Sequence, residues 1–213
     1  TLMLAGATGS ELHLISIGRE ENLFTGEVSL SEERIGLPQI GEPITQLILD
    51  PRQMWLYVFN GDSTADVFDL RKRSLNGRYD LLKDASNRVT SAKALLGGIS
   101  IMIGDAKGGI QQWFMVRDGD GKSTFQPIRS FQLGTSAITQ ILPEERRKGF
   151  MALDESGRLG IFHSTAHRTL LKEQVAEGRG IAALSPRASR VLVESDGKLQ
   201  RFVVDNPHPE VSW

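Results

Sequence analysis

Hydrophobic residues along this chain gather in short runs that are separated by small, polar turns. In five places a run ends at such a turn, and the next run places a large apolar residue five positions beyond the turn. Successive turns lie about 40 to 54 residues apart, which is typical of a repeat architecture. The turn residues are Gly9, Ser63, Gly109, Gly157 and Gly197, and the apolar residues are Leu14, Phe68, Phe114, Phe162 and Phe202.

The runs before these turns are too short for helices and are rich in β-branched and aromatic residues, so we expect strands. Two strands joined by a small, glycine-bearing turn form an antiparallel hairpin. A further apolar segment precedes four of the hairpins, and it begins Ile-Thr-Gln at both 44–46 and 138–140. A weaker strand follows most hairpins. Four antiparallel strands per unit are typical of a propeller blade.

The sequence therefore predicts an all-β, β-propeller-like (WD40-like) single domain over residues 1–213, with about five four-stranded blades and little helix. The first unit lacks its leading strand and the last has at most a stub of its fourth, so the ring is either small or incomplete. Evenly spaced strands also fit a β-sandwich or barrel, which stays open as an alternative. The predicted blade units are 1–36, 37–84, 85–134, 135–177 and 178–213.

The chain has 213 residues, a formal net charge of −1 and 39% hydrophobic residues, as globular proteins do. A nearly neutral chain has no field that attracts nucleic acid, so nucleic acid is not an expected partner. The lack of cysteine excludes disulfides and is compatible with the periplasm. No apolar run approaches the roughly 18 residues that span a bilayer. Because residues 1–4 already read as a strand, we interpret the chain as part of a longer protein.

Candidate metal ligands are sparse. His163 and His167 have the spacing of a helical metal pair, but they follow a strand and have no glutamate between them. His13 alternates with leucines and is expected in solvent. Residues 118–121, Asp-Gly-Asp-Gly, match the start of a calcium loop, but Lys122 occupies the next ligand position, so we expect a hairpin tip. No metal site is predicted.

Acidic residues recur about once per blade. They could line a central pocket as carboxylates, or they could accept hydrogen bonds from the backbone of turns. The turn interpretation is favoured because aspartate readily bonds its own backbone. The chain has neither a Gly-x-Ser-x-Gly elbow nor a complete phosphate-binding P-loop. Basic clusters at 71–73 and 146–148 are expected in solvated loops, and Trp55 and Trp113 in the core. No catalytic residue and no cofactor is predicted. The recurring residues are Asp50, Asp69, Asp105, Asp154, Asp196 and Asp205.

The closing segment Asn206-Pro207-His208-Pro209-Glu210-Val211-Ser212-Trp213 follows a repeat unit that contains Ser195-Asp196-Gly197-Lys198-Leu199. This arrangement resembles the junction in an enlarged class of bacterial phosphate ABC transporter permeases. In those proteins a propeller-like domain is inserted after the first membrane helix, and a Pro-rich, aromatic segment leads back to the permease core. The resemblance implies that this chain faces the periplasm at the inner membrane.

The same resemblance implies a non-catalytic role in phosphate import through protein contact. The chain lacks the membrane helices and the ATPase-coupling segment of the permease, so its expected partners are the rest of the permease and the periplasmic phosphate-binding protein. One alternative is a freestanding interaction scaffold of the WD-repeat type. A second is a propeller enzyme with a carboxylate-lined central pocket.

Overall fold

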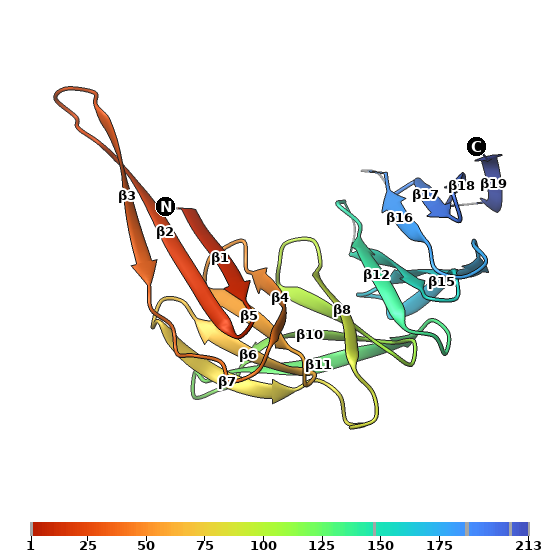
Figure 1. Cartoon of the computed structure of the whole chain (residues 1–213), viewed down its shortest axis with the longest axis horizontal. Helices are drawn as coiled ribbons and strands as arrows, with labels where there is room; N and C mark the ends of the chain where they lie inside the picture. Colours follow the sequence, from red (N-terminus) through yellow and green to blue (C-terminus); the bar gives the residue numbers. More distant parts are fainter. Residues whose placement is uncertain (1, 147, 186–187, 205, 213) are drawn as a thin grey trace. The chain divides into compact units, whose positions relative to one another are not determined.

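The computed structural model describes residues 2–146, 148–185, 188–204 and 206–212, and these form strands and turns without a helix. The strands make five separate antiparallel sheets, as Figure 1 shows. Separate sheets of three or four strands are blades and not the layers of a sandwich, so the predicted all-β, propeller-like fold is confirmed. By its internal contacts the chain divides into two compact units, Thr1–Leu81 and Leu82–Trp213. A single domain over residues 1–213 stays a prediction.

The first unit holds two sheets with strand orders β1-β2-β3 and β4-β5-β6-β7. Its strands are β1 (Leu2–Thr8), β2 (Glu11–Glu21), β3 (Val28–Ile35), β4 (Ile44–Leu49), β5 (Trp55–Asn60), β6 (Thr64–Asp69) and β7 (Ser74–Asp80).

The second unit holds three sheets with orders β11-β10-β9-β8, β12-β13-β14-β15 and β16-β17-β18-β19. The strands are β8 (Val89–Ala94), β9 (Ser100–Asp105), β10 (Gly109–Arg117), β11 (Ser123–Gln132), β12 (Ile138–Pro143), β13 (Gly149–Asp154), β14 (Arg158–His163), β15 (Arg168–Gln174), β16 (Ile181–Leu184), β17 (Arg190–Ser195), β18 (Lys198–Val203) and β19 (Asn206–Ser212).

The two ends of the repeat differ in how they match the prediction. The first sheet has three strands and lacks the leading one, as expected. The last sheet has a complete fourth strand, so the expectation of a stub was wrong. Strand β19 pairs with β18 through two register shifts, at Arg201/Phe202 and Phe202/Val203. Irregular edge pairing of this kind accommodates prolines, and Pro209 lies opposite Phe202. Trp213 lies outside the described residues.

In three of the sheets, the second and third strands are joined by the same type of turn. In the β13–β14 turn, the amide of Gly157 donates to the carbonyl of Asp154 at 3.1 Å, and Gly157 has a φ of 84°. Its own carbonyl accepts from Val175, the first residue after β15, at 3.0 Å. The turn therefore ties together the second, third and fourth strands. The same bonds join Ser63 to Asn60 and Leu81, and Gly108 to Asp105 and Leu133.

This comparison corrects the repeat in the third sheet. The residue equivalent to Ser63 and Gly157 is Gly108, with a φ of 76°, and not Gly109. Five positions later stands Trp113, which is 4% exposed, whereas Phe114 is only partly buried. Successive strand residues face opposite sides, so an offset of one residue selects the wrong side chain. The other four predicted residues are buried, namely Leu14, Phe68, Phe162 and Phe202.

The first strand of three sheets carries a bulge at a threonine. The register of β12 against β13 shifts between Ile138 and Gln140, and the intervening Thr139 donates its hydroxyl to the carbonyl of Leu153 at 3.1 Å. An extra residue at a bulge disrupts the ladder locally, and this hydroxyl adds a hydrogen bond between the two strands there. The same bond joins Thr45 to Phe59 at 3.1 Å and Thr90 to Gly104 at 3.2 Å.

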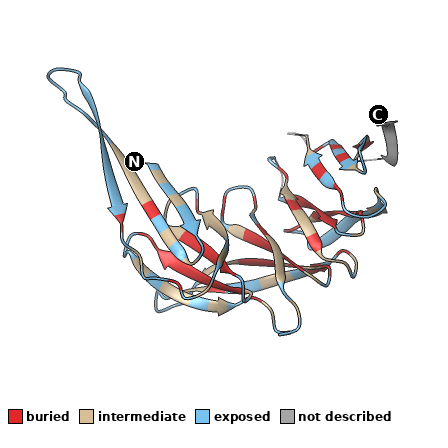
Figure 2. Ribbon diagram, in the orientation of Figure 1, coloured by how far each residue is buried: buried red, intermediate tan, exposed pale blue. Residues whose placement is uncertain are grey.

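Aromatic rings join neighbouring sheets inside the second unit. Phe150 and Phe162 are fully buried in the fourth sheet and stack at 5.0 Å. Phe131, from the third sheet, meets both rings edge-on at 5.3 and 5.4 Å. Aromatic pairs in this geometry stabilise a core beyond the area that they bury. Figure 2 shows buried residues concentrated in the middle strands of the sheets.

We predict that Gly157→Ala destabilises the protein much more than Gly178→Ala. Both glycines have positive φ, but a Cβ on Gly157 would overlap the carbonyl oxygens of Ala176 and Gly178, whereas none lies within 4 Å of a Cβ on Gly178. The φ term alone costs about 1 kcal/mol, and the overlap raises the loss at Gly157 to about 3 kcal/mol. Denaturant unfolding measures both losses; equal values would contradict the tight turn.

Candidate functional site

The recurring aspartates stabilise turns. Asp154 Oδ1 accepts hydrogen bonds from the amides of Ser156 and Arg158 at 2.9 and 3.0 Å, and Asp105 Oδ1 accepts equivalent bonds from Lys107 and Gly109. Asp69 caps the β6–β7 turn, and Asp50 accepts from the amide of Met54 at 3.4 Å. Asp196 occupies the β17–β18 turn with a φ of 51°, and Asp205 lies outside the described residues. The structure therefore uses Asp50, Asp69, Asp105 and Asp154 as the turn interpretation expects, whereas in the β17–β18 turn the amide of Gly197 donates to Glu194 at 3.0 Å.

The histidines are not brought together as a metal pair. His163 ends β14, and its Nδ1 accepts from the amide of Ala166 at 3.1 Å. His167 lies in the following turn, where its Nε2 is 2.8 Å from the carbonyl oxygen of Ser130. The side chain of His13 is 56% exposed. Among the residues that the structure describes, no cluster of three potential ligands is present.

Residues 118–122 form the tip of the β10–β11 hairpin, as the sequence predicts. The amide of Lys122 donates to Asp118 Oδ1 at 2.7 Å, and the amide of Asp118 donates to the carbonyl of Lys122 at 3.0 Å. This turn uses the first aspartate as a backbone cap and leads directly into β11.

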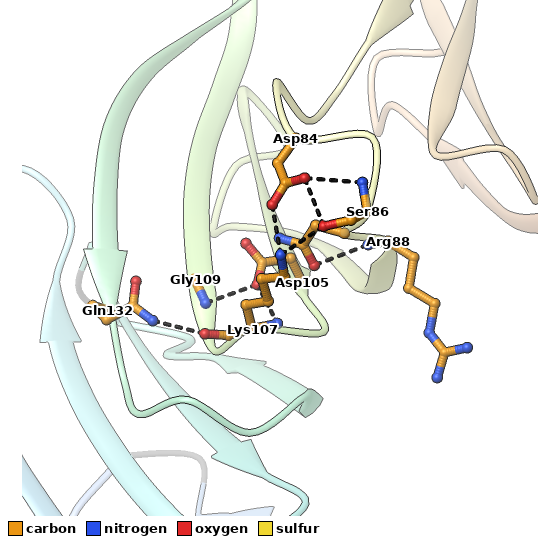
Figure 3. A network of polar contacts seen from close by, with 8 residues as sticks. Asp84, Ser86, Arg88, Asp105, Lys107, Gly109 and Gln132 are labelled. Carbon is orange, nitrogen blue, oxygen red and sulfur yellow. Dashed lines mark hydrogen bonds and ion pairs between the residues drawn. The ribbon is translucent and has the colours of Figure 1, made fainter.

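A polar network on the second unit joins two loops (Figure 3). Lys107 Nζ, from the β9–β10 turn, lies 2.6 Å from Asp84 Oδ2 and 2.8 Å from the hydroxyl of Ser86. Gln132 donates to the carbonyl of Lys107 at 2.8 Å, and Gln174 makes the equivalent bond to Ser156 in the next sheet. Because the same bond occurs in two successive sheets, the glutamine contact is a structural feature of the repeat.

This network contains a serine and a lysine, but its setting differs from that of a nucleophile with its base. A lysine acts as a general base where burial favours its neutral form. Lys107 and Asp84 are 55% and 54% exposed. The hydrogen bond from Lys107, followed by those from Ser86, lowers the pKa of Asp84 to about 2. The pair is thus an exposed ionic link between loops.

The basic clusters lie in loops, as expected. Arg71 and Lys72 lie near Asp69, and Arg73 pairs with Glu33 at 2.7 Å. Lys148 donates to the carbonyl of Leu96 at 3.0 Å, and Arg147 lies outside the described residues. Trp113 packs against Phe125 at 5.1 Å in the core, whereas Trp55 is half-buried.

The β2–β3 hairpin is the feature most suited to contact another molecule. Strand β1 pairs with residues 11–17 of β2, so β2 pairs with β3 alone from Gly18 onward. Residues 19–34 are all exposed (Figure 2). At the tip Leu23 is 93% exposed and Phe24 is 100% exposed. This tip was not predicted from the sequence, although an apolar pair within Asn22-Leu23-Phe24-Thr25-Gly26 is unusual for a turn, where polar residues are typical.

Two sheet faces also expose aliphatic residues. In β1, Leu2 and Leu4 are 53% and 49% exposed. In the last sheet, three residues that stand away from the core are also exposed, namely Ile181, Leu192 and Leu199.

An open cleft of about 430 Å³ adjoins the base of the hairpin. Its lining is largely aliphatic, with Leu12, Leu14 and Ile35 beside His13 and Arg34. Gln39 also lines it, and the other two polar side chains lie toward glutamates, His13 at 3.9 Å from Glu11 and Arg34 at 3.7 Å from Glu32.

Comparison with known proteins identifies the fold. No protein-family model and no curated protein matches the sequence. Among solved structures, the chain is similar to one in "Crystal Structure of Mitotic Checkpoint Complex", with a TM-score of 0.58 and 13% identity over 75% of this chain and 46% of that one. The aligned part is less than half of that protein. The likeness supports the WD40-like propeller fold. Within the described residues no helix is long and apolar enough to cross a membrane.

We predict that Lys107→Met raises the pKa of Asp84 from about 2 toward its ordinary value of 3.8. Because the pairing lowers the pKa in the folded state, it stabilises the fold above pH of about 4 and ceases to do so as the pH falls toward 2. NMR titration of the Asp84 carboxyl carbon measures the change. Lys172→Met, at an exposed site of another sheet, is the control. An unchanged titration in Lys107→Met would refute the assignment.

Proposed function

We propose that this chain is a non-catalytic propeller domain of a phosphate ABC transporter permease, which acts in phosphate import by protein contact at the periplasmic face of the inner membrane. The observation that carries the proposal is the exposed aliphatic face at each end of the repeat. Such faces fit a domain that is packed against further protein.

Strand alternation defines the face in the first sheet. Met3 and Ala5 pack on the buried cluster of the first unit, so Leu2 and Leu4 point to the opposite side. A propeller blade has neighbours on both faces, and β1 carries leucines on the second face of this sheet as well. Leu2 and Leu4 are thus residues of the type that is usually buried between two packed surfaces.

The last sheet has the same property. Val191 and Val193 of β17 belong to a buried cluster, whereas Leu192 between them is 39% exposed. In β16, Ala182 is buried in that cluster and the preceding Ile181 is 64% exposed. The rest of the permease is the proposed neighbour of these faces, and the phosphate-binding protein is the proposed soluble partner.

The turn aspartates are consistent with a role in contact. Asp105 and Asp154 direct their Oδ1 atoms to the amides of their own turns. A propeller enzyme with a carboxylate-lined pocket needs such groups free to face a substrate. This use of the carboxylates supports the non-catalytic interpretation.

A freestanding interaction scaffold is the second candidate. It is favoured by the similarity to a chain of the mitotic checkpoint complex, since that chain forms part of a complex. The two candidates differ in whether the full-length protein is held in the membrane with the permease.

We predict that in-frame deletion of residues 2–212 from the full-length protein reduces uptake of labelled phosphate at limiting concentration by about tenfold, because one contact worth roughly 1.4 kcal/mol is lost. Uptake of sulfate in the same cells is the control. Unchanged phosphate uptake, or a full-length protein found only in the soluble fraction, would reject the permease assignment and favour the scaffold.

A further inference from the structure

The tip of the β2–β3 hairpin carries two large apolar side chains that touch almost nothing in the described structure. Phe24 is fully exposed and Leu23 is 93% exposed. Aromatic residues are enriched among the few side chains that dominate the affinity of protein interfaces. Their position at the end of a projecting ribbon, visible in Figure 1, gives them access to a concave surface.

Hydrogen bonds within the turn fix the backbone that carries these side chains. Asn22 Oδ1 accepts from the amides of Phe24 and Thr25 at 2.9 and 3.2 Å, and the carbonyl of Asn22 accepts from Gly26 at 2.8 Å. The amide of Asn22 closes the loop on the carbonyl of Glu27 at 2.9 Å. A tip with this many internal bonds loses little conformational freedom on binding.

The charge around the tip is acidic. Residues 19–34 contain five glutamates and two arginines, and all are exposed. Arg19 lies 3.5 Å from Glu21, and the described hairpin has no ion pair to Glu20 or Glu27. Two uncompensated carboxylates therefore stand beside the apolar tip.

We propose that Leu23 and Phe24 insert into an apolar pocket of a partner protein whose rim carries lysine or arginine side chains. This inference rests on the proposed function, in which the domain works by protein contact, and it names the contact point. The carboxylates of Glu20 and Glu27 meet the basic rim, and the apolar pair fills the pocket. Complementary charge of this kind favours the correct partner and speeds encounter.

The same acidity argues against a membrane as the occupant. Segments that lie on bilayers combine apolar residues with lysine and arginine, which are attracted to anionic lipid. This hairpin carries the opposite charge next to its apolar tip. A protein pocket with a basic rim is the surface that matches both properties.

The first test places p-benzoylphenylalanine at position 24 of the full-length protein in its native cells. We expect an adduct at one site on a permease subunit or on the phosphate-binding protein, in an apolar pocket bordered by basic residues. The same probe at Leu170, which is 58% exposed in the second unit, is the control. An adduct mapping to an acidic or flat surface, or equal adducts from both positions, would overturn the proposal.

The second test measures affinity for the crosslinked protein. Phe24→Ala weakens binding about 10- to 100-fold, Glu20→Gln with Glu27→Gln weakens it about 10-fold and reduces its salt dependence, and Leu170→Ala leaves it unchanged. Asn22→Ala weakens binding while Phe24 is still present, because the tip loses its internal bonds. Thermal unfolding confirms that each variant is folded. Full affinity in folded Phe24→Ala would contradict the inference.

The third test addresses lipid directly. Phe24→Trp is mixed with vesicles of phosphatidylethanolamine and phosphatidylglycerol, and we expect no blue shift of its fluorescence. A blue shift would show that residue 24 inserts into a bilayer, and it would overturn the proposed protein pocket.

This inference and the proposed function can fail separately. If phosphate uptake depends on the domain but tolerates Phe24→Ala, this inference fails and the proposed function stands. A basic-rimmed pocket on a protein unrelated to phosphate import would leave this inference standing and reject the proposed function.

Discussion

The fold depends on one turn, in which a residue with positive φ joins the second and third strands of a sheet. In the second, third and fourth sheets the carbonyl of this residue binds the chain just after the fourth strand. The amide two positions earlier binds the chain just before the first strand, from Gly61 to Pro43, Ala106 to Arg88 and Glu155 to Ala137. One backbone conformation thereby aligns all four strands. Because strand side chains alternate, this alignment also decides which residues enter the core.

This turn explains why acidic residues recur along the chain. An aspartate at the first turn position supplies an acceptor for the amides that the tight turn leaves unpaired, which favours aspartate at this position of the repeat. Asp105 and Asp154 do this in consecutive sheets. In the second sheet Asn60 stands at that position, and Asp62 instead bonds the amide of Thr64 at 3.1 Å. These aspartates therefore recur because the backbone turn recurs, and their recurrence does not indicate a catalytic site.

The terminal sheets depart from this pattern, and they also carry the two most exposed apolar residues, Leu23 and Phe24. Their hairpins use two-residue turns at Gly9-Ser10 and Asp196-Gly197, and β16 has Ala182 where the central sheets have threonine. Terminal repeats differ because their neighbours differ. The apolar hairpin tip, the open face of β1 and the open face of β16 and β17 all belong to these two sheets. The contacts proposed above lie on these two sheets.

Sequence alone determined the class of the fold, because apolar runs of strand length and small-residue turns at regular intervals have few structural solutions. It also located four of the five repeated core residues, including Phe68 and Phe162. It did not distinguish Gly108 from Gly109, because adjacent glycines suit a turn equally and only the hydrogen bonds of Asp105 and Leu133 select one. Tertiary structure alone decided that Leu23 and Phe24 remain in solvent, since burial depends on whether another strand or sheet reaches a side chain, and β1 ends its pairing before the tip.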